Sequence, residues 1–163
     1  MLTVVPHLPT RVIIALAGYC GLSCSEIQGL CWEAYDVDNS EIEVLSSVVR
    51  GRKGGPKTEA RKDRVPVVRK VKELLDLYRL QLGNPTSGVM FSTANGTPVA
   101  LHNLYFDRID PILNPCEPCG KSKEFHHRSD RRQKDHEYRR REGLVVWHGW
   151  HAFRRGLRAI CTN

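Results

Sequence analysis

The sequence predicts an α+β fold that is mostly helical, with a small antiparallel hairpin sheet. Three observations predict it: apolar residues recur at helical spacing over 69–82, β-branched residues gather over 42–49, and turn-forming residues lie between the two patterns. The 163 residues, 40% hydrophobic and 26% charged, are typical of one globular domain. The longest apolar run, residues 12–17, is too short to span a bilayer. Wholesale disorder and a transmembrane anchor are therefore not expected.

Two helices are expected first. The apolar stretch 12–19 predicts a buried helix. Ser23-x-x-Glu26 has the pattern of a capping box, in which the serine closes the first helical turn and the glutamate reaches back to its N–H. The helix that begins there is expected to run to residues 31–32.

A β-hairpin is expected next. Residues 36–40 have turn chemistry, 42–49 predict one strand, and 64–68 predict a second. The basic, glycine-rich segment 51–55 is expected to form the turn at the tip. Lys57 would then lie on or beside that tip.

The following elements alternate between helix and turn. Residues 69–82 give the clearest amphipathic helix, and Gly83-Asn84-Pro85 ends it. Residues 89–91 predict a short strand and 95–96 a turn. A further helix is expected over 101–113.

The charge is concentrated in the last third of the chain. The net charge is +7. Residues 1–115 hold 13 basic and 12 acidic side chains, whereas residues 116–163 hold 12 basic and 6 acidic side chains. A concentrated basic surface suits a polyanion such as nucleic acid, and a merely solvated surface is the alternative. The residues expected to contact DNA are Arg52, Lys53, Arg131, Arg132, Arg139, Arg140 and Arg155.

Four motifs occur in a fixed order: Gly-Leu-Ser-Cys-Ser-Glu-Ile at 21–27, Gly-Pro-Lys-Thr at 55–58, Arg-Val-Pro-Val at 64–67, and His-Ala-Phe-Arg-Arg-Gly at 151–156. In this order and spacing they resemble the catalytic domain of the tyrosine recombinases, the phage integrase family. The resemblance divides the chain into a first part of the catalytic domain at 1–115, an inserted basic, zinc-knuckle-like module at 116–143, and a catalytic-domain helix at 144–163.

The resemblance implies DNA strand exchange through a phosphotyrosine, as in the integration or excision of a mobile element. Lys57 matches the hairpin lysine that protonates the leaving oxygen. His151 and Arg154 match the His-x-x-Arg box, where Arg and His donors stabilise the charge of the transition state. Glu26 matches an acidic residue that orients its neighbours. The chemistry needs no nucleotide cofactor, because covalent catalysis conserves the bond energy.

Two departures from the family pattern lower the expected activity. The first arginine of the family falls at Ser23, which cannot neutralise a phosphate. All five tyrosines (Tyr19, Tyr35, Tyr78, Tyr105, Tyr138) precede His151, whereas the nucleophile is expected beyond Arg154. The sequence therefore resembles a C-terminally truncated, degenerate domain. We expect a cytoplasmic, nucleoid-associated protein that binds double-stranded DNA without cleaving it and associates with copies of itself or a full-length recombinase.

The cysteines fall into two groups. Cys20, Cys24 and Cys31 lie among apolar residues and are expected to pack as small hydrophobes. Cys116-Glu-Pro-Cys119-Gly has the spacing of a zinc knuckle, so a structural zinc is expected there. The remaining ligands would be His126 or His127, together with His136.

Three alternatives stay open. The alternative for the cysteine pair is a reduced, metal-free pair in a flexible basic loop. A zinc-supported His-Asn-His nuclease is weakly suggested by Cys-x-x-Cys followed by Asp135-His136-Glu137. A non-catalytic DNA-binding module is the third alternative.

Overall fold

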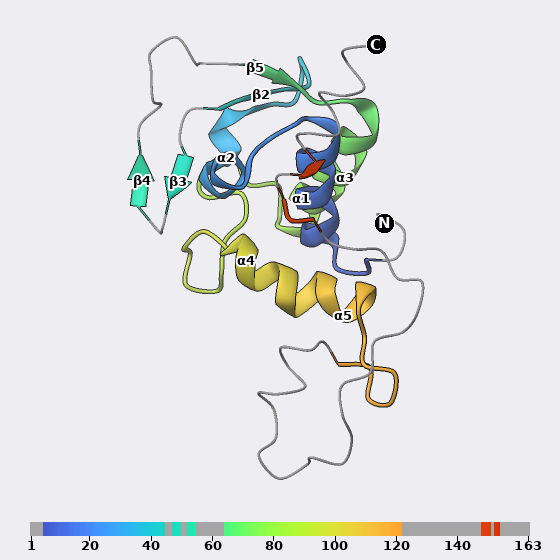
Figure 1. Cartoon of the computed structure of the whole chain (residues 1–163). Coiled ribbons are helices and arrows are strands. Elements are labelled where there is room, and N and C mark those ends of the chain that lie inside the picture. Colours follow the sequence, from blue (N-terminus) through green and yellow to red (C-terminus); the bar gives the residue numbers. More distant parts are fainter. Residues whose placement is uncertain are drawn as a thin grey trace.

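Helix α1 (Leu8–Tyr19) lies at the centre of the protein, and helix α3 (Arg69–Gln81) packs against it (Figure 1). The computed structural model describes residues 5–44, 47–49, 52–54, 64–121, 148–150 and 152–153. Within α1 all residues from 12 to 17 are buried, the pattern of a helix covered on all sides. The predicted helix is confirmed and begins earlier than expected. Pro9 fits its first turn, where a missing N–H breaks no bond.

Helix α2 (Cys24–Gly29) begins at the predicted capping box but is shorter than expected. Leu30 is extended, so the prediction of a helix running to residues 31–32 is wrong. The cause is backbone pairing with a distant segment: the N–H of Trp32 donates to the carbonyl of Gly88, and the N–H of Met90 to that of Leu30, both at 2.9 Å. These bonds satisfy groups that a longer helix would have paired internally. A 3-10 turn (Trp32–Ala34) follows.

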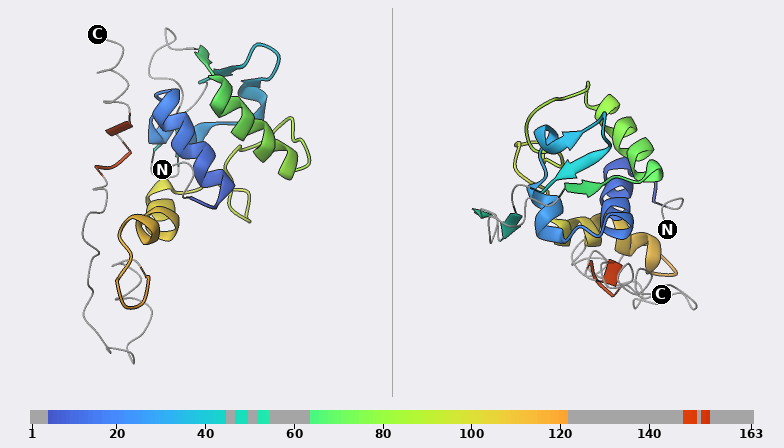
Figure 2. Two further views of the ribbon diagram at one scale, coloured as in Figure 1. Left: turned by 90° about the vertical axis from the view of Figure 1, so that its right-hand side faces the viewer. Right: turned by 90° about the horizontal axis from the view of Figure 1, so that it is seen from above.

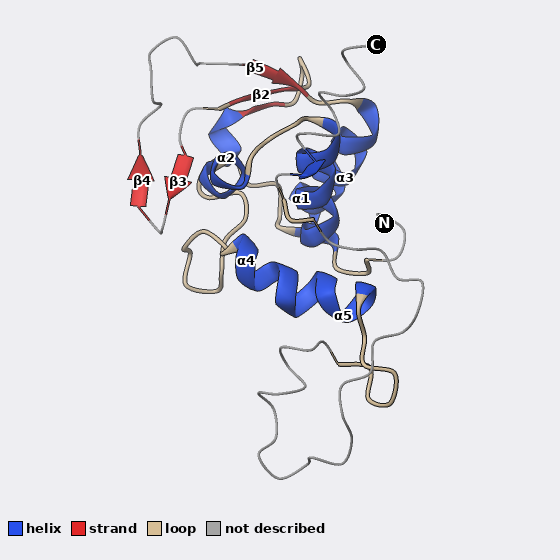
Figure 3. Cartoon of the chain, viewed as in Figure 1, coloured by secondary structure: helices blue, strands red, loops and turns tan. Residues whose placement is uncertain are grey.

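A three-stranded antiparallel sheet follows, in the order β1-β2-β5. Its strands β2 and β5 lie side by side in Figure 3. Strand β1 (Tyr35–Asp36) pairs with β2 (Glu41–Glu43), and β2 pairs with β5 (Arg64–Pro66). Ile42, opposite Val65, is fully buried under the sheet. The antiparallel pairing predicted for the two strands around the basic segment is confirmed.

The strand predicted over 42–49 is interrupted. Its second half is β3 (Ser47–Val49), which pairs with β4 (Arg52–Gly54) in a separate two-stranded hairpin with Val49 opposite Arg52. Residues 52–54, predicted within a turn, are therefore in a strand, because the segment just before them supplies a partner. This hairpin lies beside α2 (Figure 1).

Helix α3 is amphipathic as predicted, with Val71, Leu75 and Tyr78 buried. Leu82, expected on the same face, is 51% exposed. The helix ends at Gln81, and Gly83 has a φ of +80°, so the chain turns away before Leu82 can reach the core.

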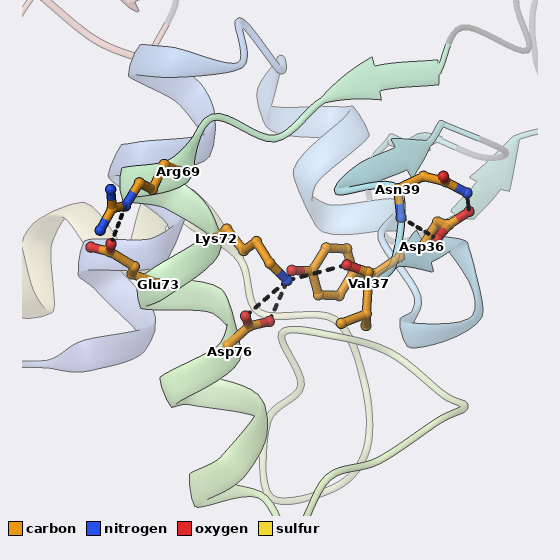
Figure 4. Close-up of polar contacts among 8 residues, drawn as sticks. Asp36, Val37, Asn39, Arg69, Lys72, Glu73 and Asp76 are labelled. Atoms are coloured by element: carbon orange, nitrogen blue, oxygen red, sulfur yellow. Dashed lines mark hydrogen bonds and ion pairs between the residues drawn. The ribbon is translucent and has the colours of Figure 1, made fainter.

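A polar cluster connects α3 to the sheet (Figure 4). The Lys72 ammonium donates to the Val37 carbonyl at 3.2 Å and lies 3.0 Å from Asp76 Oδ2. The Tyr35 hydroxyl donates to Asp76 Oδ1 at 2.9 Å. Burial, together with the Asp76 carboxylate, raises the pKa of Tyr35 far above its ordinary value. Tyr35 is therefore a neutral donor that fixes the position of β1 on α3.

Residues 101–113 form the predicted helical segment, with a widened turn in the middle. Helix α4 (Leu101–Leu104) leads into a π segment (Tyr105–Ile109) and then into α5 (Asp110–Leu113). Pro111 has no N–H and would crowd the preceding turn of a regular α-helix, so a wider turn suits this position. The helical segment ends at Asn114, just before Pro115.

Two clusters of buried side chains form the core. The larger joins α1, α2, the sheet and α3, and the smaller joins α1 to the 101–113 segment (Figure 2). Trp150 and Phe153 are half-buried and pack against both clusters. In the described ranges no helix has the length and apolar character needed to cross a bilayer.

Candidate functional site

The first turn of α2 contains Glu26, one of the predicted site residues. The Ser23 Oγ accepts a bond from the Glu26 N–H at 3.4 Å, and Glu26 Oε2 accepts one from the Ser23 N–H at 2.7 Å. These two bonds form the predicted capping box. The serine at position 23 thus closes a helix end and brings no positive charge, and the carboxylate of Glu26 is directed toward the backbone of residue 23.

The residues on either side of His151 lie against the end of α1. A methyl group added at Gly18 would meet the Phe153 ring at 3.5 Å, so the helix backbone and the ring approach closely. Trp150 lies beside Phe153, with ring centroids 6.3 Å apart. Trp150 also lines a cavity with Cys24, the first residue of α2. Cys24 and Trp150, distant in sequence, therefore line the same cavity.

The shared cavity has a volume of about 550 Å³ and lies between α2, the 101–106 region and residues 149–150. Its walls are mostly apolar and aromatic, and among the described residues no Arg or Lys lines it. The cavity is therefore apolar, and the described residues that line it offer no Lys or Arg cation to a phosphate. The lining residues are Cys24, Gln28, Ala100, Leu101, His102, Tyr105, Phe106, Gly149 and Trp150.

Sequence reasoning missed this cavity, although its signal is present. His102 and Phe106 are four residues apart on one helical segment. Their rings are in edge-to-face contact, with centroids 4.8 Å apart. Trp150 and Phe153 are three residues apart. Two aromatic pairs at helical spacing indicate two aromatic surfaces in the folded chain. The spacing alone does not predict that these two surfaces face each other.

The structure brings together only part of the predicted site. Lys57, His151 and Arg154 lie outside the described residues; Lys57 follows β4, and His151 lies between described neighbours. Arg52 and Lys53 form part of β4. The other predicted DNA-contacting and metal-binding residues outside the described ranges are Arg131, Arg132, Arg139, Arg140, Arg155, His126 and His136.

Three tyrosine hydroxyls in the described part of the chain donate hydrogen bonds inside the protein. Burial raises the pKa of Tyr35 and of Tyr78 above the ordinary value. A tyrosine nucleophile needs the opposite change, toward easier deprotonation. The three bonds join Tyr35 to Asp76 Oδ1, Tyr78 to the Met90 carbonyl and Tyr105 to Asp110 Oδ1, at 2.9, 3.0 and 3.0 Å.

Two of the three cysteines near the N-terminus, Cys20 and Cys24, pack against the hydrophobic core as predicted. Cys20 and Cys24 lie at the edge of the larger core cluster, and burial raises the pKa of both thiols, which disfavours the reactive thiolate form. Cys31 is half-buried and donates to the Gly29 carbonyl at 3.7 Å. Within the described ranges, no three His, Cys, Asp or Glu side chains gather in a way that could hold a metal.

The fold is similar to that of DNA-bound integrases. A Tn1549 transposon integrase in complex with a circular intermediate DNA aligns with a TM-score of 0.62 at 17% identity, over 99% of this chain and 50% of that chain. Another complex of this integrase with circular intermediate DNA aligns with a TM-score of 0.61 at 20% identity, over 94% of this chain and 48% of that chain. The complex of this integrase with transposon right end DNA aligns with a TM-score of 0.61 at 21% identity, over 91% of this chain and 44% of that chain.

The chain spans about half the length of the integrase chains that it matches. No family model and no curated protein sequence matches it. The structural likeness confirms the recombinase-like fold that the motifs predict.

Proposed function

We propose that this chain is a recombinase-like domain that binds double-stranded DNA without cleaving it. The observation that carries the proposal is the integrase-like fold, in which Cys24 and Trp150 line one cavity. The solved structures that share this fold are complexes with DNA. The excess of 12 basic over 6 acidic side chains in residues 116–163 supports a polyanion as the partner.

The DNA phosphate is assigned to Lys57, His151 and Arg154. Each is a cation or hydrogen-bond donor that matches a recombinase motif. Glu26 holds the start of α2 through its bond to the Ser23 N–H and acts as a positioning residue. Phosphate contacts of this kind fix the orientation of the duplex without reading its sequence.

The residue at position 23 lowers the expected rate of cleavage. A preorganised cationic donor to the transition state is typically worth about 3–4 kcal/mol, or about 10²–10³ in rate. Ser23 carries no charge, and its hydroxyl closes the end of α2. The hydrogen-bonded tyrosines of the described core are also poor nucleophiles, because deprotonation would break an internal bond.

A mobility-shift titration with a fluorescent duplex tests the proposal. Binding should weaken steeply with salt, with a slope of about 0.9 for each phosphate contacted. Arg154→Ala and Lys57→Ala should each weaken binding and lower that slope by about one. Arg158→Ala and Lys62→Ala, which change a like charge nearby in the sequence, are the matched controls. If the variants and the controls lose the same binding affinity, the chain attracts DNA through its overall charge, and the proposed phosphate site is wrong.

A further inference from the structure

The cavity between α2, the 101–106 region and residues 149–150 has the size of a small-molecule site. Its volume of about 550 Å³ lies within the range of about 300–1,000 Å³ that is usual for such sites. Among the described residues, no Asp, Glu, Lys or Arg lines it. A fully charged ligand would lose its hydration there without gaining a counter-charge, so the cavity favours an uncharged ligand.

Aromatic rings from two segments line this cavity. Tyr105 and Phe106 are the first two residues of the π segment, and Trp150 belongs to the second segment. The rings of Tyr105 and Phe106 are in edge-to-face contact, with centroids 5.0 Å apart. The Tyr105 hydroxyl donates to Asp110 Oδ1 at 3.0 Å, which holds its ring in place. Widened helical turns are frequent at functional sites, and fixed aromatic surfaces favour a planar ligand that stacks on them.

A side-chain amide adds a polar group to the cavity wall. Gln28 of α2 lines the cavity, and its Nε2 donates to the Val99 carbonyl at 3.0 Å. This bond joins residues 71 positions apart and holds the amide in place. A glutamine amide has a second N–H and an oxygen, so it can donate and accept in one plane. Glutamine pairs in this way with the N6 amino group and N7 of adenine.

We propose that the cavity binds an uncharged, planar heteroaromatic ring of the purine type. The aromatic walls hold the faces of the ring, and the Gln28 amide pairs with an amino group and a nitrogen at its edge. A purine ring can come from a free nucleoside or from an unpaired base of DNA, and both sources present the same chemistry. Only the second source rests on the DNA binding proposed above, because the cavity does not include Lys57, His151 or Arg154.

Isothermal titration calorimetry of the full chain with adenosine tests the site. We expect saturable binding with a dissociation constant of about 0.1–1 mM, as is usual for a ligand of this size. Ala100 lines the cavity and is exposed, so Ala100→Trp should fill the opening without displacing the core and weaken binding at least about tenfold. Ala94→Trp, at an exposed alanine in a turn outside the cavity, is the matched control and should leave binding unchanged.

A change at Gln28 separates pairing at the ring edge from packing. The unmodified chain should prefer adenosine to purine riboside, which lacks the amino group. Gln28→Leu removes the amide and keeps a side chain of similar size, so it should lower that preference by about fivefold or more. A purely structural effect would weaken both ligands equally. Gln81→Leu, at an exposed glutamine of α3, is the control and should keep the preference.

Two duplexes identify the source of the ring. If the cavity takes a DNA base, a duplex with one unpaired adenine should bind more tightly than its fully paired counterpart, and Ala100→Trp should remove the difference. Equal affinities for the two duplexes, together with saturable adenosine binding, assign the site to a free nucleoside.

Three results would overturn the proposal. They are no saturable adenosine binding by the folded chain up to about 10 mM, equal losses in Ala100→Trp and Ala94→Trp, and an unchanged ligand preference in Gln28→Leu. A failure of duplex binding in the mobility-shift test would leave the adenosine titration unaffected, so the two proposals fail separately.

Discussion

Replacing Ser23 and Glu26 by alanine measures how the first turn of α2 is stabilised. The two bonds of the capping box differ in length: Ser23 Oγ accepts at 3.4 Å, near the outer limit of a hydrogen bond, whereas Glu26 Oε2 accepts at 2.7 Å and carries a charge. Ser23→Ala should therefore lower the free energy of unfolding by only about 0.5–1 kcal/mol. Glu26→Ala should lower it by about 1.5 kcal/mol or more, since bonds to charged groups are worth about 1.5–3 kcal/mol.

Urea unfolding with linear extrapolation gives these free energies. The double variant should lose less than the sum of the single losses, because both bonds close the same helical turn. Ser87→Ala, at an exposed serine in a bend, is the control and should change stability by less than about 0.5 kcal/mol. A larger loss for Ser23→Ala than for Glu26→Ala, or strictly additive losses, would refute this account of the turn.

Three further predictions concern packing, the tyrosine cluster and pH. Gly18→Ala should stabilise the protein by about 0.5–1 kcal/mol in thermal unfolding, because the new methyl meets Phe153 at an ordinary contact distance of 3.5 Å. Gly18→Leu should instead destabilise it, and equal stability of the two variants would contradict the contact. Tyr35→Phe should cost about 1 kcal/mol or more in urea unfolding by removing the bond to Asp76, and a neutral result would contradict that bond. Burial lowers the pKa of His7 below 6.5, so the unfolded chain takes up the proton first. Its contribution to stability is thus complete above about pH 6.5 and is lost as the pH falls through the folded-state pKa; His7→Gln should flatten that part of the stability curve, and an unchanged slope would contradict it.

Local sequence patterns predicted the elements whose stability is local. The capping box at Ser23 and Glu26 depends on residues three apart, and α3 depends on a helical repeat of apolar residues within 69–82. Both were predictable because the partners that satisfy each backbone group lie within a few residues. The likeness to integrases could be inferred in the same way, since its motifs are short and follow a fixed order.

Elements that depend on distant partners were predicted less well. Residues 30–32 leave the helix because they pair with residues 88–90, and no pattern near residue 30 indicates that partner. The cavity beside Trp150 arises where three segments meet. In each case the deciding contact joins residues whose separation in sequence carries no periodic signal.

The central claim is DNA binding without cleavage, and a single substrate tests both parts. A binding site is first selected from a pool of random duplexes and then nicked, so that a cleaved strand would stay covalently attached to the protein. Native gels should show a retarded complex with the unmodified chain and a weaker one with Arg154→Ala. Denaturing gels of the same reactions should show no protein–DNA adduct. A denaturation-resistant adduct that a tyrosine-to-phenylalanine change abolishes would contradict the claim, and so would the absence of any complex at low salt.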